Sequence, residues 1–354
     1  MSGTERAGTA ARAYWPTLLL PLATHLDLVT APHRGGATAA VVVFLAGLVV
    51  ADRLSPSDRA RPDPTASFLG FEALLLALAI LQVSSLGLFL HVVARGDARL
   101  PDLVAMTFLV GVNSGYSAIV VAHELIHRPT RRARLVGQAL LATVLYGHFF
   151  VEHLRGHHRR VATLEDPATA RFGESFCAFL PRSVAGQLRS AVQIERERIG
   201  TGDGRSLIIG WPTSPLVVGC AAQMLLLACV AQVFGVLASQ LLVGQALVAI
   251  SCLEAANYVE HWGLVRRQGV AVQETDSWDT DSRFSRRALL ALPRHADHHL
   301  HAGRPSFALQ LTEQSPKLPY GHFAAIFLAL VANRRFRAMA RRELEAKRLG
   351  PFGA

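Results

Sequence analysis

Cysteine is scarce in this chain of 354 residues, and its four cysteines are scattered. None of Cys177, Cys220, Cys229 and Cys252 belongs to a C-x-x-C pair, and three of them lie in apolar runs. This pattern argues against a disulfide framework and against a thiolate metal site. We therefore expect the cysteines to be small buried apolar residues.

The sequence also lacks an internal repeat, a low-complexity tract and a clean signal-peptide cleavage site. The first apolar segment, Trp15–Thr30, is interrupted by Pro16, Pro21, His25 and Asp27. These interruptions do not fit the uninterrupted apolar core of a secretory signal. We interpret this segment as the start of a membrane domain.

Charged residues are few, at 18% of the chain, but their balance gives a net charge of +10. The basic residues form no stripe interleaved with aromatic residues, which argues against a nucleic-acid partner. They lie mostly between apolar runs, which is typical of loops that face an anionic cytoplasmic leaflet of membrane lipid. The basic-rich side, expected to be cytoplasmic together with both termini, carries Arg53, Arg59, Arg61, Arg128, Arg131, Arg132 and Arg134.

Hydrophobic residues make up 51% of the chain, and several apolar runs approach the length that crosses a bilayer. They predict an all-α integral membrane protein with six transmembrane helices in three hairpins. The predicted pairs are Trp15–Thr30 with Ala37–Ala51, Phe68–Val93 with Leu103–Ala122, and Trp211–Val233 with Val236–Ala256. The first turn contains Pro32, Gly35 and Gly36, and the third contains Gly235.

Two shorter apolar segments complete the prediction. Gln138–Val151 is expected to be a re-entrant or interfacial helix, and Phe323–Ala332 a short docking helix. The predicted units are an N-terminal transmembrane hairpin with its linker (1–67), a main membrane domain (68–335) and a basic C-terminal tail (336–354).

Nine of the fifteen histidines fall into four clusters at the polar ends of apolar segments. Several are three or four residues apart, a spacing that places two imidazoles on one helix face, where both can bind one ion. All four clusters are predicted on the cytoplasmic side, so they should converge in a histidine-rich cap. The clusters are HELIHR with His123 and His127, EHLRGHH with His153, His157 and His158, NYVEHWGL with His261, and LPRHADHH with His295, His298 and His299.

The number of histidines bears on which metals they hold. HELIH alone matches the zinc-protease motif, but nine imidazoles are too many for one tetrahedral ion. They suit two ions, and imidazole binds iron, copper and zinc alike. A metal transporter is a further alternative, although its histidines should lie within the spans. The remaining histidines are expected to be isolated structural or surface residues: His25, His33, His91, His148, His301 and His322.

Polar residues beside the clusters are candidates to orient the metal-binding rings. A ligating imidazole usually donates its second N–H to a carboxylate or a carbonyl. The alternative is that these residues cap helices or pair with neighbouring arginines. The candidates are Glu124, Glu152, Asp166, Asn257, Glu260 and Asp297.

The four motifs resemble, in order, the histidine boxes of the integral-membrane alkane 1-monooxygenases, which belong with the membrane fatty-acid desaturases and hydroxylases. The segment from Gly156 to Phe176 and the pair Ser277–Trp278 extend the resemblance, which covers about residues 70–335. The chain departs from the family at three places. It has Trp262 where the family often has Tyr, Pro293–Arg294 where the family often has a Gln–Arg pair, and Ala296 where the family often has Ser. Trp262 either shapes the reaction pocket or simply packs.

The resemblance implies a non-haem di-iron centre held by the nine clustered histidines. It implies hydroxylation of the terminal C–H bond of an alkane or a similar hydrophobic substrate by O2. It also implies electrons from a separate rubredoxin and its rubredoxin reductase, in a bacterial-type inner membrane. The alternatives are a hydroxylase of aryl methyl groups, like the xylene monooxygenase subunit, and a fatty-acid desaturase or hydroxylase. Phe71, Phe89, Phe108 and Tyr116 either line a substrate channel or pack between helices.

Overall fold

The computed structural model describes residues 13–33, 36–62, 68–200 and 210–353. Within these ranges the regular structure is helical, and the extended segments form only two isolated bridges. The predicted all-α class is therefore confirmed for this part of the chain. Residues 1–12 of the predicted N-terminal unit, the turn residue Gly35 and linker residues 63–67 lie outside the described ranges.

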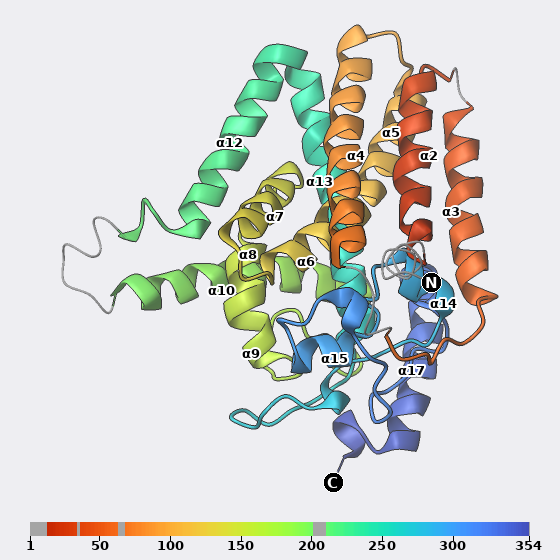
Figure 1. Cartoon of the computed structure of the whole chain (residues 1–354), viewed down its shortest axis with the longest axis vertical. Helices are drawn as coiled ribbons and strands as arrows, with labels where there is room; N and C mark the ends of the chain where they lie inside the picture. The colour runs from red at the N-terminus through yellow and green to blue at the C-terminus, as the bar shows by residue number, and fades with distance from the viewer. Residues whose placement is uncertain (1–12, 34–35, 63–67, 201–209, 354) are drawn as a thin grey trace.

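The upright helices of Figure 1 form one end of the molecule. A short helix, η1 (Trp15–Leu18), leads into α2, and α5 continues through η2 into α6 without a break. The upright helices are α2 (Leu19–Thr30), α3 (Ala37–Arg53), α4 (Phe68–Arg95), α5 (Leu100–Asn113), η2 (Ser114–Val120), α6 (Val121–Ile126), α12 (Pro215–Phe234) and α13 (Val236–His261).

Four of the helices in the described part of the chain are long and apolar enough to cross a membrane. They are Leu69–Arg95, Leu100–Ile126, Pro215–Phe234 and Val236–His261. The two N-terminal helices stand beside them but contain only 12 and 17 residues. The second and third predicted hairpins are thus present as long apolar helices, and the first as a shorter pair.

The third hairpin illustrates how the sequence sets helix ends. Ser214 begins α12, because its hydroxyl accepts a hydrogen bond from the Val217 N–H at 3.1 Å and Pro215 follows at the first helical position. Gly235 ends it with a φ of 91°, a conformation that favours glycine. The chain then reverses directly into α13.

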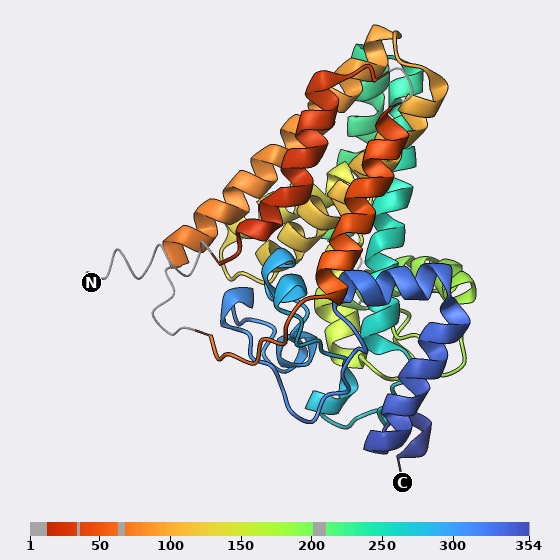
Figure 2. The ribbon, with the colours of Figure 1, turned by 90° about the vertical axis from the view of Figure 1, so that its right-hand side faces the viewer.

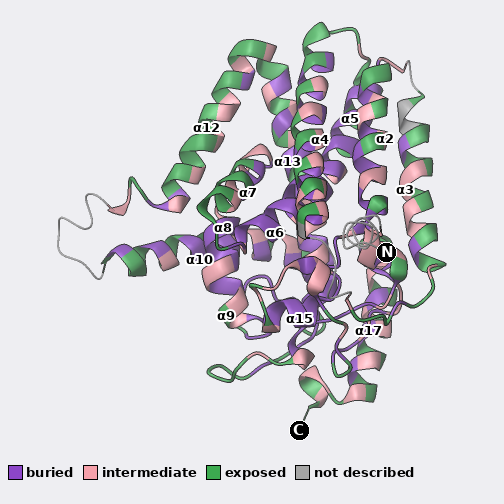
Figure 3. Cartoon of the chain, viewed as in Figure 1, coloured by how far each residue is buried: buried purple, intermediate pink, exposed green. Residues whose placement is uncertain are grey.

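The cysteines do not follow the expectation of burial. Cys177, Cys220 and Cys229 are exposed, and Cys252 is only partly buried. Cys220 and Cys229 lie on α12, which leans away from the bundle and has an outer face without protein neighbours (Figures 1 and 3). In a bilayer this face contacts lipid, so an apolar residue there need not be buried in protein.

The lower part of the molecule consists of helices that lie beside or across the lower ends of the upright helices. Most of them are short. Its purple colouring in Figure 3 marks it as the most deeply buried region. Its elements are α7 (Arg131–Thr143), α8 (Phe149–Glu152), η3 (His153–His157), α9 (His158–Arg160), α10 (Phe176–Gly200), η4 (Glu274–Asp276), α14 (Arg283–Ala288), α15 (His295–Leu300) and η5 (Ser306–Ala308). The C-terminal helices are α16 (His322–Val331), α17 (Asn333–Lys347) and η6 (Gly350–Phe352), seen in blue in Figure 2.

The expectation of one helix over Gln138–Val151 is wrong. Helix α7 ends at Thr143, and Leu145 takes a φ of 53° in the turn that follows. The Tyr146 N–H returns to the Leu141 carbonyl at 3.0 Å, so the chain reverses before α8 begins. The predicted docking helix is confirmed as α16, and α17 buries Phe336, Ala340 and Leu344 at four-residue spacing.

Asp52, at the end of α3, holds the N-terminal hairpin on the lower part of the molecule. Its carboxylate accepts hydrogen bonds at 2.6 Å from the hydroxyls of Ser282 and Ser285, and at 3.0 Å from the Ala324 N–H. Asp52 is almost fully buried, and Gly321 packs so closely that a Cβ there would lie 1.8 Å from its Oδ1. One carboxylate therefore joins α3, α14 and α16.

Replacement of this carboxylate should destabilise the fold. We expect Asp52→Ala to cost about 1–3 kcal/mol, because it leaves buried donors without an acceptor. The measurement is the temperature at which the detergent-solubilised protein loses its helical circular dichroism. The control is Asp97→Ala, which removes an exposed carboxylate paired with Arg95 and should not change the transition. Equal transition temperatures for the two variants would contradict the role of Asp52.

Candidate metal centre

The nine clustered histidines meet at the lower end of the bundle and form two groups. Within each group, the ring nitrogens that could bind a metal ion all lie within 4.8 Å of one another. The first, called here the five-histidine group, contains His123, His127, His153, His158 and His298. The second, the four-histidine group, contains His157, His261, His295 and His299. Four segments that are far apart in the sequence therefore supply one compact set of imidazoles.

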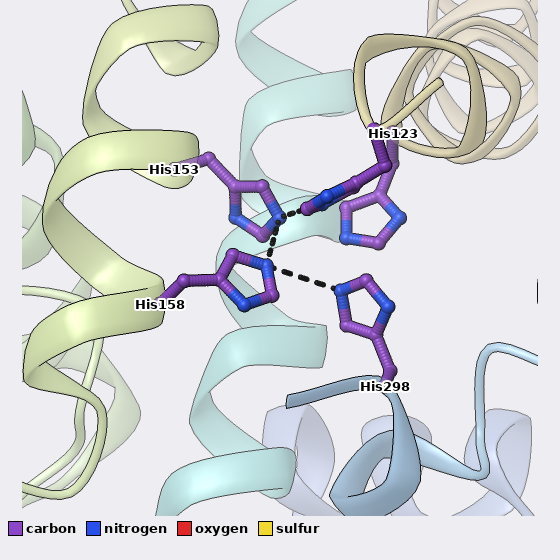
Figure 4. A group of neighbouring side chains, drawn as sticks. His123, His153, His158 and His298 are labelled. Carbon is purple, nitrogen blue, oxygen red and sulfur yellow. Dashed lines mark hydrogen bonds between the residues drawn. The ribbon is translucent and has the colours of Figure 1, made fainter. Parts of the chain in front are cut away.

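In the five-histidine group the rings face a common point. Figure 4 shows His123, His153, His158 and His298 turned towards one another from three separate parts of the chain. The Nε2 atom of His153 lies 3.0 Å from those of His127 and His158, and His158 Nε2 lies 3.2 Å from His298 Nε2. His123 and His127 share this group, as their four-residue spacing on one helix face predicts.

The second histidine cluster divides differently from a regular α-helix. Four-residue spacing would place His153 and His157 on one face, but His153 shares the five-histidine group with His158 instead. The reason is that residues 153–157 form a π-helix, η3, whose wider turn brings residues five apart onto one face. His157 consequently points into the four-histidine group.

The last cluster also divides between the groups. Helix α15 presents His295 and His299, four apart, to the four-histidine group, and His298 to the five-histidine group. His295 Nε2 lies 3.2 Å from His261 Nε2 and 3.0 Å from His299 Nε2. Of the two histidines that follow it on α15, His295 therefore shares a group with His299 and not with His298.

These distances fit nitrogen ligands around an ion. At a metal–nitrogen distance of about 2.1 Å, neighbouring ligands are about 3.0 Å apart at right angles and about 3.4 Å apart in a tetrahedron. Three of the observed contacts, at 3.0 Å, match the first value, and the two at 3.2 Å lie midway between the two values. The five imidazoles of the five-histidine group exceed a tetrahedral set, so this group favours an ion with more than four ligands.

Most of the rings are held in the uncharged form that binds metal. Burial, together with the charges of His157 and Arg134, lowers the pKa of His127 to about 3. Burial also lowers the pKa values of His153, His158, His298 and His299 well below the usual value, because a charged ring would lose its hydration. The site therefore presents free nitrogen lone pairs at neutral pH.

Asp166 supports one of the rings from behind. Its Oδ2 lies 2.9 Å from His157 Nδ1, which leaves His157 Nε2 to face the four-histidine group. Burial alone would lower the pKa of His157, but the Asp166 carboxylate raises it. Thr169 donates a hydrogen bond to the same oxygen at 2.6 Å. This is the arrangement in which a carboxylate fixes the orientation of a ligating imidazole.

Glu260 approaches the same group from its other side. Its Oε2 lies 3.4 Å from His295 Nε2, the nitrogen that faces the other rings, and its Oε1 lies 2.9 Å from His322 Nε2. Glu260 therefore faces the ligand side of His295 and not its back.

Three of the other residues predicted to orient the rings pair with basic residues outside the nine clustered histidines. Glu124 pairs with Arg128 at 2.5 Å, and Glu152 contacts Arg160 at 3.1 Å. Burial and the nearby Asp166 charge raise the pKa of Glu152 to about 7. Asp297 contacts Arg304 at 2.6 Å and His301 at 2.8 Å. Each of these three carboxylates therefore pairs with a basic neighbour.

An apolar cavity of about 80 Å³ opens onto both groups. It touches His123 and His153 of the five-histidine group and His295 of the four-histidine group. Its volume is roughly that of two to three water molecules, enough for a short alkyl segment. Its remaining wall is formed by Ile119, Val120, Phe149, Leu253, Ala256, Asn257, Glu260, Leu289, Leu292, Pro293 and His322.

Sequence reasoning missed most of this cavity. Phe71, Phe89 and Tyr116 are buried away from its wall, and Phe108 faces outward. Trp262 packs against Phe172, with ring centroids 5.2 Å apart, and donates to the Glu174 carbonyl, so packing is its role. His322 is buried beside Glu260, and no spacing signal in the sequence marks it.

Comparison with known proteins places these features in a family context. The fatty acid desaturase family matches residues 100–327. Alkane 1-monooxygenase 1 of Pseudomonas aeruginosa is 35% identical, over 90% of this chain and 87% of that protein. The alkane 1-monooxygenase of Acinetobacter baylyi is 32% identical, over 72% of this chain and 63% of that protein. The xylene/toluene monooxygenase hydroxylase component of Pseudomonas putida is 25% identical, over 65% of this chain and 62% of that protein.

Removal of one ring from the five-histidine group should reduce metal binding. We expect purified His298→Ala to lose most of one metal ion per chain, measured by elemental analysis. The matched control is His301→Ala on the same helix end, because His301 belongs to neither group and its side chain is half exposed. Equal metal content in the two variants would remove His298 from the set of ligands.

Loss of the Asp166 charge should weaken the four-histidine group without removing a ring. We expect Asp166→Asn to lower metal affinity roughly 10- to 100-fold, as is usual for a residue that orients a ligating histidine. Competition with a chelator measures this affinity. The exposed neighbouring variant Glu165→Gln should bind metal like the unchanged protein, and a similar retention in Asp166→Asn would refute the orienting role.

Proposed function

We propose, from the premise that this chain belongs to the fatty acid desaturase family and within it to the alkane 1-monooxygenases, that it is a membrane monooxygenase of hydrophobic substrates. The overall reaction converts RH, O2, two electrons and two protons into ROH and water. The observation that carries the proposal is the apolar cavity that reaches histidines of both groups. It gives a C–H bond a water-poor place beside the metal-binding rings.

We assign the nine clustered histidines as ligands of two iron ions, one in each group. The division into five and four converging imidazoles supports this number. When bound, such a di-iron pair would supply the activation of O2 and the oxidising power for hydroxylation. The protein's own part is to hold the rings, to bind and aim the substrate, and to exclude water.

Substrate recognition in this proposal is apolar. Leu253, Leu289 and Leu292 line the cavity and offer no hydrogen-bonding group to the substrate. A wall of this kind selects by shape, and each methylene contributes only about 1–3 kcal/mol of discrimination. The cavity has room for the end of a hydrocarbon chain, which suits attack at a terminal carbon.

We further propose a six-helix membrane domain with the histidine groups on the cytoplasmic side of a bacterial-type inner membrane. Helix α3, with 17 residues, would be about 26 Å long, only slightly shorter than a hydrocarbon core of about 30 Å. Arg53, Arg128 and Arg131 lie at the ends of helices that point towards the histidines, which supports this orientation. The division at residues 67 and 335 remains a prediction.

The electron donor in this proposal is a separate rubredoxin, reduced by rubredoxin reductase. The four cysteines of the chain form no C-x-x-C pair and so provide no electron-carrying site of that kind. The basic loops on the proposed cytoplasmic side would suit an acidic protein of this type.

A second candidate, hydroxylation of aryl methyl groups, follows from the similarity to the xylene/toluene monooxygenase component.

Cells that express this chain with a rubredoxin system should be given octane, hexadecane, xylene and a fatty acid together. We expect 1-octanol or 1-hexadecanol as the main product, and none from the His298→Ala variant. Methylbenzyl alcohol as the main product would favour the second candidate, and a desaturated fatty acid would reject hydroxylation.

A further inference from the structure

His322 is a tenth histidine at the centre and belongs to neither metal-binding group. It is buried, with 3% of its surface exposed, and it lines the cavity. Its Nε2 atom contacts Glu260 Oε1 at 2.9 Å. The question is therefore what this side chain does for Glu260.

The other oxygen of Glu260 faces the four-histidine group. Glu260 Oε2 lies 3.4 Å from His295 Nε2, a separation similar to those between the ring nitrogens themselves. His322 thus contacts one carboxylate oxygen, while the second faces His295 Nε2. Without that contact, the carboxylate would be free to rotate about its terminal torsion, which is broad and weakly restrained.

His322 is itself fixed by groups outside the site. Its backbone N–H donates to the Ser285 hydroxyl at 2.7 Å, and that hydroxyl donates to Asp52 Oδ1 at 2.6 Å. A chain of contacts consequently runs from the end of α3 through His322 to Glu260 and the four-histidine group.

We propose that His322 is a positioning residue, which keeps the Glu260 carboxylate against the four-histidine group. That carboxylate gives the group a negative charge and a candidate fifth donor. Among the described residues, the five-histidine group makes no corresponding carboxylate contact. The two ions of the proposed centre would therefore have different surroundings, one all imidazole and one imidazole with carboxylate.

The experiment compares full-length protein purified from cells grown with iron-57. The variants are His322→Ala, His322→Gln and the control His25→Ala, which removes a histidine next to Ser85 and away from the centre. Gln retains an N–H that can reach Glu260, whereas Ala does not. Iron per chain, Mössbauer spectra, kcat and KM for octane are measured for each variant.

The unchanged protein should show two iron environments. In His322→Ala one of the two should change, and kcat should fall roughly tenfold with little change in KM, as is common when a residue behind a ligand is lost. His322→Gln should restore both properties, and His25→Ala should leave both unchanged. Identical spectra for the unchanged protein and His322→Ala would overturn the proposal.

A second variant covers the case in which His322→Ala does not fold. Glu260→Gln removes the charge that His322 is proposed to hold, so it should alter the same iron environment. His322→Leu, which keeps the bulk but cannot hydrogen-bond to Glu260, should change little when it is added to Glu260→Gln, although alone it should alter that iron environment, because residues that act as one unit are not additive. Independent, additive effects would contradict the proposal.

The inference rests on the proposed function, and the spectra separate the two. Absence of iron from the unchanged protein would reject the di-iron monooxygenase itself. Two normal irons with no response to His322 would reject only the role of this residue.

Discussion

Nine imidazoles can occupy one buried space only if nearly all of them are uncharged, and the rest of the structure depends on this constraint. Burial removes water from each ring, and every protonated ring would repel its neighbours. The pKa values of most rings are lowered accordingly. What remains is a set of inward-facing lone pairs that cannot satisfy one another and that metal ions can satisfy.

Helix geometry divides these rings between the two groups. A regular helix places His123 and His127 together, and the π-helix at His153 sends His157 to the other group. The carboxylates follow the same division, because Asp166 and Glu260 both contact rings of the four-histidine group. Position along the chain therefore matters less than the local helical turn in deciding which group a ring joins.

Much of this architecture could be predicted from the sequence. Apolar length indicated the long helices, and the number and spacing of the clustered histidines indicated that their rings converge in a site that could hold metal. The sequence could not predict that His158, and not His157, would share a group with His153. A π-helix differs from an α-helix by one residue in the spacing of its hydrogen bonds and leaves no clear sequence signal. The cavity and His322 were missed because they depend on contacts between segments far apart in the chain, such as Glu260 with His322. The exposed cysteines were missed because a lipid-facing surface looks like a core in composition.

The central claim is that the two histidine groups hold one iron ion each. The most direct measurement is an anomalous difference map, recorded at the iron absorption edge from crystals of the purified full-length protein. The account predicts two peaks, one among the five rings that include His153 and one among the four that include His295. A single peak shared by all nine rings, or peaks only at the zinc edge, would contradict it.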